Sequence, residues 1–169
     1  MNILSIEIKA KVANLTRIAA LLQSKNARFV GEDHQIDTYF KVADGRLKLR
    51  QGNIENSLIR YHRPESLELK RSAVLLQKLP TDNEALRQIL TESLGLFKVV
   101  EKKRKIYFID NVKFHLDEVL GLGTFVEIEA LDLGQDKTEQ ELAAQCDYYI
   151  DFLGLDRGRF VDKAYSDLI

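Results

Sequence analysis

The chain is poor in the features that mark secreted and membrane proteins. Its 169 residues include a single cysteine, Cys146, which excludes an intramolecular disulfide framework and fits a reducing compartment. No stretch approaches the roughly 18 apolar residues of a membrane span. The start Met1-Asn2-Ile3 lacks a basic region followed by an apolar signal core. We therefore expect a cytoplasmic protein.

Neither sign of charge dominates, and the common catalytic motifs are missing. The 25 Lys and Arg residues nearly cancel the 26 Asp and Glu residues, so no global field attracts nucleic acid or an anionic membrane. There is no Gly-rich phosphate loop, no Ser/His/Asp or Cys/His set, and the three histidines are too scattered for a zinc site. The length and the 45% hydrophobic content fit one globular domain over residues 1–169. Any anion binding must come from local segregation of charge.

The spacing of apolar residues and the capping and turn signals predict three helices and eight strands, which make an α+β fold. All three helices are amphipathic, and Cys146 lies on the apolar stripe of the third, so we expect it in the core. The helix starts carry capping signals at Asn14, at a Thr81/Glu84 box and at a Thr138/Glu141 box, and the third helix ends at Gly154. The strands are expected at 3–11, 37–43, 46–51, 57–64, 73–79, 98–109, 112–119 and 124–131, with hairpins at Asp44-Gly45 and Asp110-Asn111.

Several of these strands concentrate charge on one face. In S-I-E-I-K-A-K (5–11), Glu7 and Lys9 share a face because side chains alternate along a strand. The same alternation occurs in R-L-K-L-R (46–50), V-K-F-H-L-D (112–117) and F-V-E-I-E-A (125–130). A solvated outer face is the simpler reading of any single strand. The acidic and basic strands are separate, however, which predicts a site for a metal ion and a polyanion.

The helices and strands together suggest where the charged face lies. If the helices cover the apolar face of the sheet, the charged face is either open to water or turned inward. Eight strands are about the number that closes into a barrel. We therefore expect a closed, mostly antiparallel β-barrel with the helices outside and a hydrophilic tunnel inside.

The order of several short motifs resembles the CYTH superfamily, which holds class IV adenylyl cyclases and thiamine triphosphatases and is also called the triphosphate tunnel metalloenzymes. The motifs are S-I-E-I-K (5–9), D-T-Y-F (37–40), L-K-L-R (47–50), L-I-R-Y-H-R-P (58–64), V-E-K-K-R (100–104), H-L-D-E-V-L-G-L-G-T-F-V-E-I-E (115–129) and Y-S-D-L (165–168). The run at 115–129 is most similar to the cyclase branch. The resemblance implies a tunnel in which Lys and Arg grip a triphosphate while carboxylates hold Mg²⁺ or Mn²⁺.

The resemblance also implies roles for particular residues. Glu127 and Glu129 match the principal metal ligands, with Glu7 and Asp117 as further contributors. Ser5 stands where the family has its first Glu. The residues implied to grip the triphosphate are Lys9, Lys48, Arg50, Arg63, Lys78, Lys102, Arg104 and Lys113, with Lys9 and Arg50 implied to be catalytic. The sequence leaves open whether Arg60 or Arg63 points into the tunnel.

Three functions remain open at this point. In a cyclase, the 3′-hydroxyl of ATP attacks the α-phosphorus and pyrophosphate leaves. In a triphosphatase, water attacks the terminal phosphorus of an inorganic, nucleoside or thiamine triphosphate, with Lys9 as a possible general base. The replacement at Ser5 motivates a third reading, a non-catalytic polyphosphate or nucleotide binder. The homologous enzymes suggest a monomer or a homodimer.

An empty cationic tunnel is expected to be unstable. Two cations about 8 Å apart at an effective dielectric of roughly 20 repel each other by about 2 kcal/mol. Six or seven such groups would therefore favour tight binding of an anion.

Overall fold

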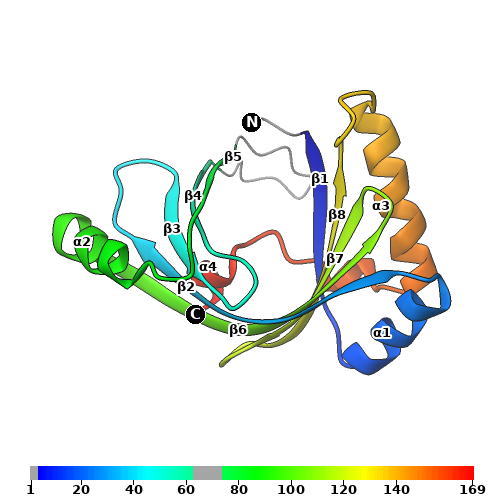
Figure 1. The fold of residues 1–169 in the computed structure, drawn as a ribbon. Helices are drawn as coiled ribbons and strands as arrows, with labels where there is room; N and C mark the ends of the chain where they lie inside the picture. Colours follow the sequence, from blue (N-terminus) through cyan, green and yellow to red (C-terminus); the bar gives the residue numbers. More distant parts are fainter. Residues whose placement is uncertain (1–3, 63–73) are drawn as a thin grey trace.

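The computed structural model describes residues 4–62 and 74–169. In this part of the chain, eight strands form one antiparallel sheet in the order β1-β8-β7-β6-β2-β3-β4-β5. Figure 1 shows the sheet curled into a trough, with β1, β7 and β8 in one wall and β3, β4 and β5 in the other. The strands are β1 (Ser5–Lys11), β2 (Arg28–Phe40), β3 (Arg46–Gln51), β4 (Ser57–Tyr61), β5 (Val74–Lys78), β6 (Leu96–Ile109), β7 (Val112–Val119) and β8 (Gly123–Leu131). The expected α+β class and the eight-stranded antiparallel sheet are confirmed.

Closure of the expected barrel is only partial. β1 and β5 lie at the two ends of the strand order, and within residues 4–62 and 74–169 they do not pair. The last part of the chain lies along the second edge of β1. Ala10 forms an isolated bridge with Phe160, and the backbone N–H of Val161 donates to Lys9 O at 2.8 Å. This segment protects backbone groups that an edge strand would otherwise expose.

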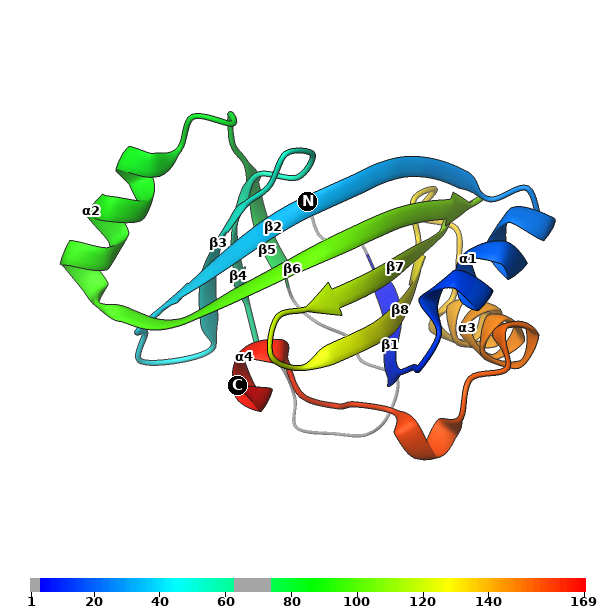
Figure 2. The same cartoon turned by 90° about the horizontal axis from the view of Figure 1, so that it is seen from below.

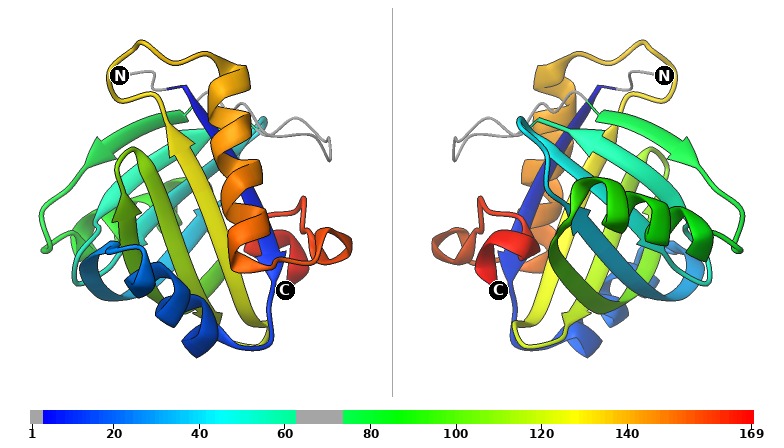
Figure 3. Two further views of the ribbon diagram at one scale, coloured as in Figure 1. Left: turned by 90° about the vertical axis from the view of Figure 1, so that its right-hand side faces the viewer. Right: turned by 90° about the vertical axis from the view of Figure 1, so that its left-hand side faces the viewer.

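Helices α1 (Leu15–Ser24) and α3 (Glu139–Leu153) cover the outer face of the β1-β8-β7 wall, as Figure 3 shows. Ile6 and Ile8 of β1 point outward into a core that also contains the fully buried Cys146. Because side chains alternate along the strand, Glu7 and Lys9 point into the trough. The expectation that helices cover the apolar face and that the charged face turns inward is confirmed for α1 and α3, whereas α2 (Glu84–Leu94) buries no residue fully.

The predicted capping residue is confirmed for two of the three helices. The side chain of Asn14 caps α1, and the capping box at Thr138 opens α3. The box expected at Thr81 is wrong, because α2 (Glu84–Leu94) begins after Asn83. Asn83 is buried and its amide forms hydrogen bonds to the loops around it, so this residue fixes where the helix can begin.

Strand β2 is longer than the sequence indicated, beginning at residue 28 rather than 37 and ending at 40 rather than 43. Residues 32–35 are polar and pair with charged residues of β6, so no apolar alternation marks them. Cross-strand pairs such as His34 and Glu101, 2.7 Å apart, join the two strands there. The turn around Asp44-Gly45 is consequently a longer loop than the tight hairpin expected. The hairpin at Asp110-Asn111 is confirmed.

After α3 the chain forms a 3₁₀ turn, Arg157–Arg159, and ends in the short helix α4 (Tyr165–Leu168). Figure 2 shows α4 beside β6, below this strand in that view. The expectation that this tail packs on the domain is confirmed. In the described part of the chain, none of the helices has the length and apolar character needed to cross a bilayer.

Candidate active site

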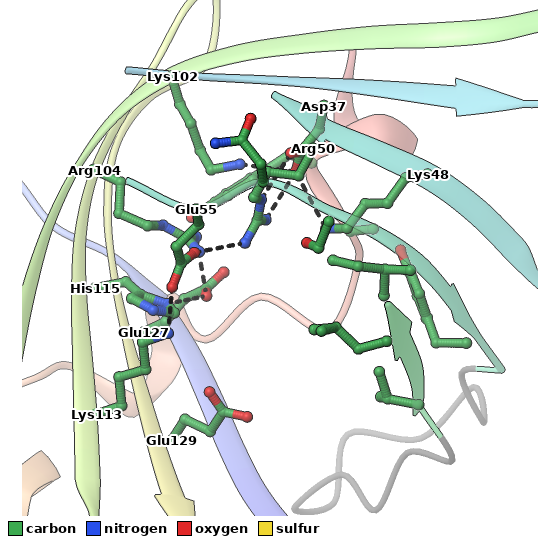
Figure 4. A pocket seen from close by; sticks show the side chains of 18 of the residues that line it. Asp37, Lys48, Arg50, Glu55, Lys102, Arg104, Lys113, His115, Glu127 and Glu129 are labelled. Carbon is green, nitrogen blue, oxygen red and sulfur yellow. Dashed lines mark hydrogen bonds and ion pairs between the residues drawn. The ribbon is translucent and has the colours of Figure 1, made fainter. Parts of the chain in front are cut away.

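A cavity of about 450 Å³ occupies the inside of the trough. All eight strands contribute side chains to it, and Tyr165 of α4 closes part of its wall. Figure 4 shows its charged side chains converging from opposite walls on one space. The alternation that places apolar residues against the helices therefore also gathers the charges of distant strands.

The structure brings ten of the twelve predicted site residues to this cavity: Glu7, Lys9, Lys48, Arg50, Lys78, Lys102, Arg104, Lys113, Glu127 and Glu129. Asp117 does not line the cavity and is fully buried behind its wall. Arg63 lies outside the described residues. Ile59 and Tyr61 of β4 line the cavity, whereas Arg60 points away and donates to a backbone carbonyl. Of the pair left open by the sequence, Arg60 is therefore the one the structure removes from the site.

Asp37 is the centre of the first ion-pair cluster. Arg50 donates to both its carboxylate oxygens at 2.9 Å, and Lys102 and Lys48 approach at 2.9 and 3.2 Å. Burial alone would raise the pKa of Asp37, but the three cations hold it well below its usual value. Burial lowers the pKa of Lys102 to about 7, against the attraction of Asp37 and with repulsion from Arg50.

Glu127 is the centre of a second cluster on the opposite wall. Its carboxylate lies 3.2 Å from Lys9 Nζ, 3.2 Å from an Arg104 nitrogen and 3.0 Å from His115 Nδ1. Arg104 also donates to both oxygens of Asp117, at 2.7 and 2.6 Å. Burial, with repulsion from Arg104, lowers the pKa of His115 to about 4, so the imidazole is neutral at pH 7. The neutral ring therefore donates its Nδ1 proton to Glu127.

Tyr165 connects the C-terminal helix α4 to the cluster around Glu127 and Asp117. Its hydroxyl donates to Asp117 at 2.7 Å, and Lys9 Nζ lies 4.1 Å from the centre of its ring. The ring also packs on Phe125, with the two ring centres 5.0 Å apart. A cation over an aromatic face is attracted to it, so Tyr165 helps fix the position of Lys9.

Glu7 and Glu129 face each other across the β1-β8 pairing. Burial and the neighbouring charge of Glu7 raise the pKa of Glu129 to about 7, with Lys113 acting in the opposite direction. Two adjacent carboxylates in a partly desolvated position suit a divalent cation, whose ligands are hard oxygens. The four predicted metal ligands are nevertheless not gathered as one cluster: within the described ranges, no group of three or more His, Cys, Asp or Glu residues is arranged to hold a metal.

Glu55 is a residue that the sequence analysis missed. It lies in the loop between β3 and β4, where no strand alternation indicates which way a side chain points. Its carboxylate lies 2.7 Å from Lys113 Nζ and 3.1 Å from an Arg50 nitrogen, so it spans the two walls (Figure 4). Asp37 lies in the D-T-Y-F motif and Tyr165 in the Y-S-D-L motif, but the family resemblance implied no role for either residue.

The charge balance differs from the expected array of mutually repelling cations. Each of six cations has a carboxylate oxygen within 3.2 Å: Lys9, Lys48, Arg50, Lys102, Arg104 and Lys113. They share four carboxylates, those of Asp37, Glu55, Asp117 and Glu127. Most of the repulsion is therefore offset within the protein, and an anion must exchange with these pairs in order to bind.

Strands β4 and β5 add an apolar surface to the same cavity. Ile59, Tyr61, Val74 and Leu76 of these strands line it, and Tyr39 of β2 lines it as well. Asn56, Ser57 and Lys78 are polar lining residues from the same part of the described chain. The cavity thus combines a cluster of charged side chains with an apolar and aromatic surface, which suits an organic molecule that carries several negative charges at one end.

The fold and the site define a trough-shaped domain that presents cations and carboxylates to an anionic ligand. The chain belongs to the CYTH domain family, whose model matches residues 4–157. A Methanocaldococcus jannaschii protein named "Putative adenylate cyclase" is 25% identical over 177 residues, which cover 98% of each chain. A Pyrococcus horikoshii structure has 25% identity and a TM-score of 0.83, covering 98% of this chain and 99% of the other.

A structure from Hippeastrum shares the fold alone, at 13% identity. Its TM-score is 0.64, and the match covers 95% of this chain and 91% of the other. That protein is described as a "Putative adenylyl cyclase" with a dominant triphosphatase activity.

Proposed function

We propose that this protein is a metal-dependent enzyme that acts on a nucleoside triphosphate in the cavity, as a class IV adenylyl cyclase. The observation that carries the proposal is that one cavity combines many cations with an apolar and aromatic surface. The cations suit the triphosphate, and the apolar surface suits the base and the sugar. Inorganic tripolyphosphate alone would leave the apolar surface without a partner.

The cations of the cavity would bind and orient the phosphates. Cyclisation forms a bond between the 3′-oxygen and the α-phosphorus and breaks the bond to the β-phosphate oxygen, so negative charge develops on the departing pyrophosphate. Arg50 and Lys102 meet at Asp37, whereas Lys9 and Arg104 meet at Glu127, so the two pairs can contact different phosphates. Cations held in place before the reaction stabilise the developing charge without reorganisation.

The residues that suit a metal ion are Glu7 and Glu129, with Glu127 next to them on β8. Mg²⁺ or Mn²⁺ bound there would neutralise phosphate oxygens and polarise the reacting phosphorus. Asp117 supports the site differently, because both its oxygens already accept from Arg104. It keeps the guanidinium group of Arg104 in position beside Glu127.

Triphosphate hydrolysis is the second candidate. Among the described residues, the apolar surface carries few polar groups that could recognise one base, which favours a site tolerant of different triphosphates. Water rather than a ribose hydroxyl would then attack the terminal phosphorus, with the same cations holding the phosphates. Ser5, where the family has a carboxylate, does not line the cavity, although it lies on the same face of β1 as Glu7 and Lys9.

Product analysis separates these reactions. The purified protein is incubated with ATP, tripolyphosphate or thiamine triphosphate, each with Mg²⁺ or Mn²⁺, and the products are resolved by anion-exchange chromatography. Cyclic AMP with pyrophosphate supports the cyclase, whereas orthophosphate with a diphosphate supports the triphosphatase. Binding without turnover of any substrate would contradict both and leave a polyphosphate or nucleotide binder.

A further inference from the structure

We propose that Glu55 is a resident counter-anion of the substrate site, which holds Arg50 and Lys113 in the empty protein and is displaced when phosphate binds. This inference rests on the proposed function, since it takes the cations of the cavity as phosphate ligands. It predicts the unusual result that removing a charged residue from the site tightens substrate binding.

The Glu55 carboxylate lies between two cations, where a bound anion would lie. One oxygen lies 2.7 Å from Lys113 Nζ, and the other lies 3.1 Å from an Arg50 nitrogen and 3.1 Å from the amide nitrogen of Gln35. Lys113 extends from β7 and Arg50 from β3, so the carboxylate joins opposite walls of the trough. A phosphate group that contacts both cations must occupy the same space.

Only the side chain of Glu55 needs to move, because its loop is fastened to β2. Asp33, fully buried, accepts hydrogen bonds from the backbone N–H groups of Ile54 and Glu55, each at 2.9 Å. Gly52 allows this approach, since a Cβ atom there would lie 2.6 Å from an oxygen of Asp33. The backbone therefore holds the carboxylate at the edge of the cavity while leaving the side-chain torsions free to turn.

Exposure separates Glu55 from the other carboxylates that pair with the cavity cations. The side chain of Glu55 is 26% exposed, whereas those of Glu127, Asp37 and Asp117 are 15%, 2% and 0% exposed. A partly exposed carboxylate can rotate into water and be rehydrated, but a buried one has no such alternative. Glu55 is thus the residue able to give way to a ligand and to return when the product leaves.

The test compares the Glu55→Gln variant with the wild type in calorimetric titrations with inorganic tripolyphosphate, without metal and with Mg²⁺. Glutamine keeps the shape but cannot compete as an anion, so we expect the dissociation constant to fall about tenfold, which corresponds to about 1.4 kcal/mol. Glu32→Gln is the matched control. It removes the same charge from an exposed pair with Lys105, so it should leave the constant unchanged.

Thermal melting gives a second readout that does not depend on the affinity measurement. The empty Glu55→Gln protein should melt below the wild type, because Lys113 loses its carboxylate partner. The two proteins should melt at similar temperatures when both are saturated with tripolyphosphate, since phosphate then holds the cations in each.

The outcomes distinguish this inference from the proposed function. Tighter binding in Glu55→Gln alone supports the counter-anion. Unchanged or weaker binding in this variant, or equal tightening in the Glu32 control, overturns it while wild-type binding still supports the proposed function. A wild-type protein that binds no tripolyphosphate under either condition overturns the proposed function and this inference with it.

Discussion

Asp37 should contribute more to stability than any other single charge in the cavity. It is 1% exposed and accepts from Arg50 at 2.9 Å twice, from Lys102 at 2.9 Å and from Lys48 at 3.2 Å. In the Asp37→Asn variant, three cations lose their common counter-charge inside the protein. Removing one partner of a buried ion pair destabilises a protein by about 3–5 kcal/mol. For a domain of this size, the melting temperature should fall by about 6–20 °C.

Urea denaturation followed by circular dichroism measures this loss directly. The control is Asp147→Asn, which removes a half-exposed carboxylate paired with Arg157 at 3.1 Å and should cost at most about 1 kcal/mol. Tripolyphosphate should stabilise the Asp37 variant more than the wild type, because phosphate replaces the missing counter-charge. A loss below about 1 kcal/mol for Asp37→Asn would refute the reasoning, since it would mean that the three cations do not need this carboxylate.

The pH dependence of stability gives an independent check on Asp37. Its folded-state pKa lies well below its usual value because three cations favour the charged form. Between the unfolded pKa, about 3.9, and the lower folded pKa, the unfolded chain binds more protons than the native protein. The stabilisation is therefore present above about pH 4 and lost as the pH falls through the folded value. Above about pH 5, the titration of Asp37 itself should add no further pH dependence to the difference between wild type and variant.

Further predictions address the catalytic groups and the core. Glu129→Gln and Arg50→Ala should each reduce turnover at least a hundredfold in the product assay, as expected when a metal ligand or a transition-state cation is removed; wild-type rates would contradict these roles. Because the folded pKa of Glu129 is raised to about 7, its contribution to the stability of the metal-free wild type should fall as the pH rises from about 4.5 to 7, whereas His115, with its pKa lowered to about 4, contributes in the opposite direction. Glu129→Gln removes only the first contribution, so in urea titrations the stability of the variant relative to the wild type should rise over this range. Tyr165→Phe keeps the ring under Lys9 but removes the hydrogen bond to Asp117, so it should cost about 1–3 kcal/mol in the same titrations; no change would show that the hydroxyl is dispensable. Cys146→Ala should leave turnover unchanged and lower only stability.

Alternation of side chains explains why much of the fold and site was predictable. In β1 and β8 the apolar residues must face the helices, and this requirement places Glu7, Lys9, Glu127 and Glu129 on the inner face. The pairing of Lys9 with Glu127 then follows from the register. A period of two within each strand thus fixed the direction of these side chains before any contact between strands was known.

The contacts that the sequence did not predict depend on distant segments. Residues 32–35 of β2 show no apolar alternation, because they pair with charged residues of β6. Glu55 reaches the cavity only because Asp33, in that same segment of β2, holds its loop. One missed strand segment therefore concealed one site residue, and no local signal near Glu55 could have shown it.

Because the cavity cations already pair with carboxylates, the free energy of ligand binding includes the cost of replacing those ion pairs. Had Lys9, Arg50 and Lys113 been unpaired, an anion would gain the full relief of their repulsion, as the sequence alone suggested. In the structure each already has a carboxylate within 3.2 Å, so a phosphate gains only the difference between its own contacts and those it replaces. A triphosphate offers several oxygens to several cations at once, whereas orthophosphate offers one group. The internal carboxylates therefore favour highly charged ligands, because only these can exchange many pairs together.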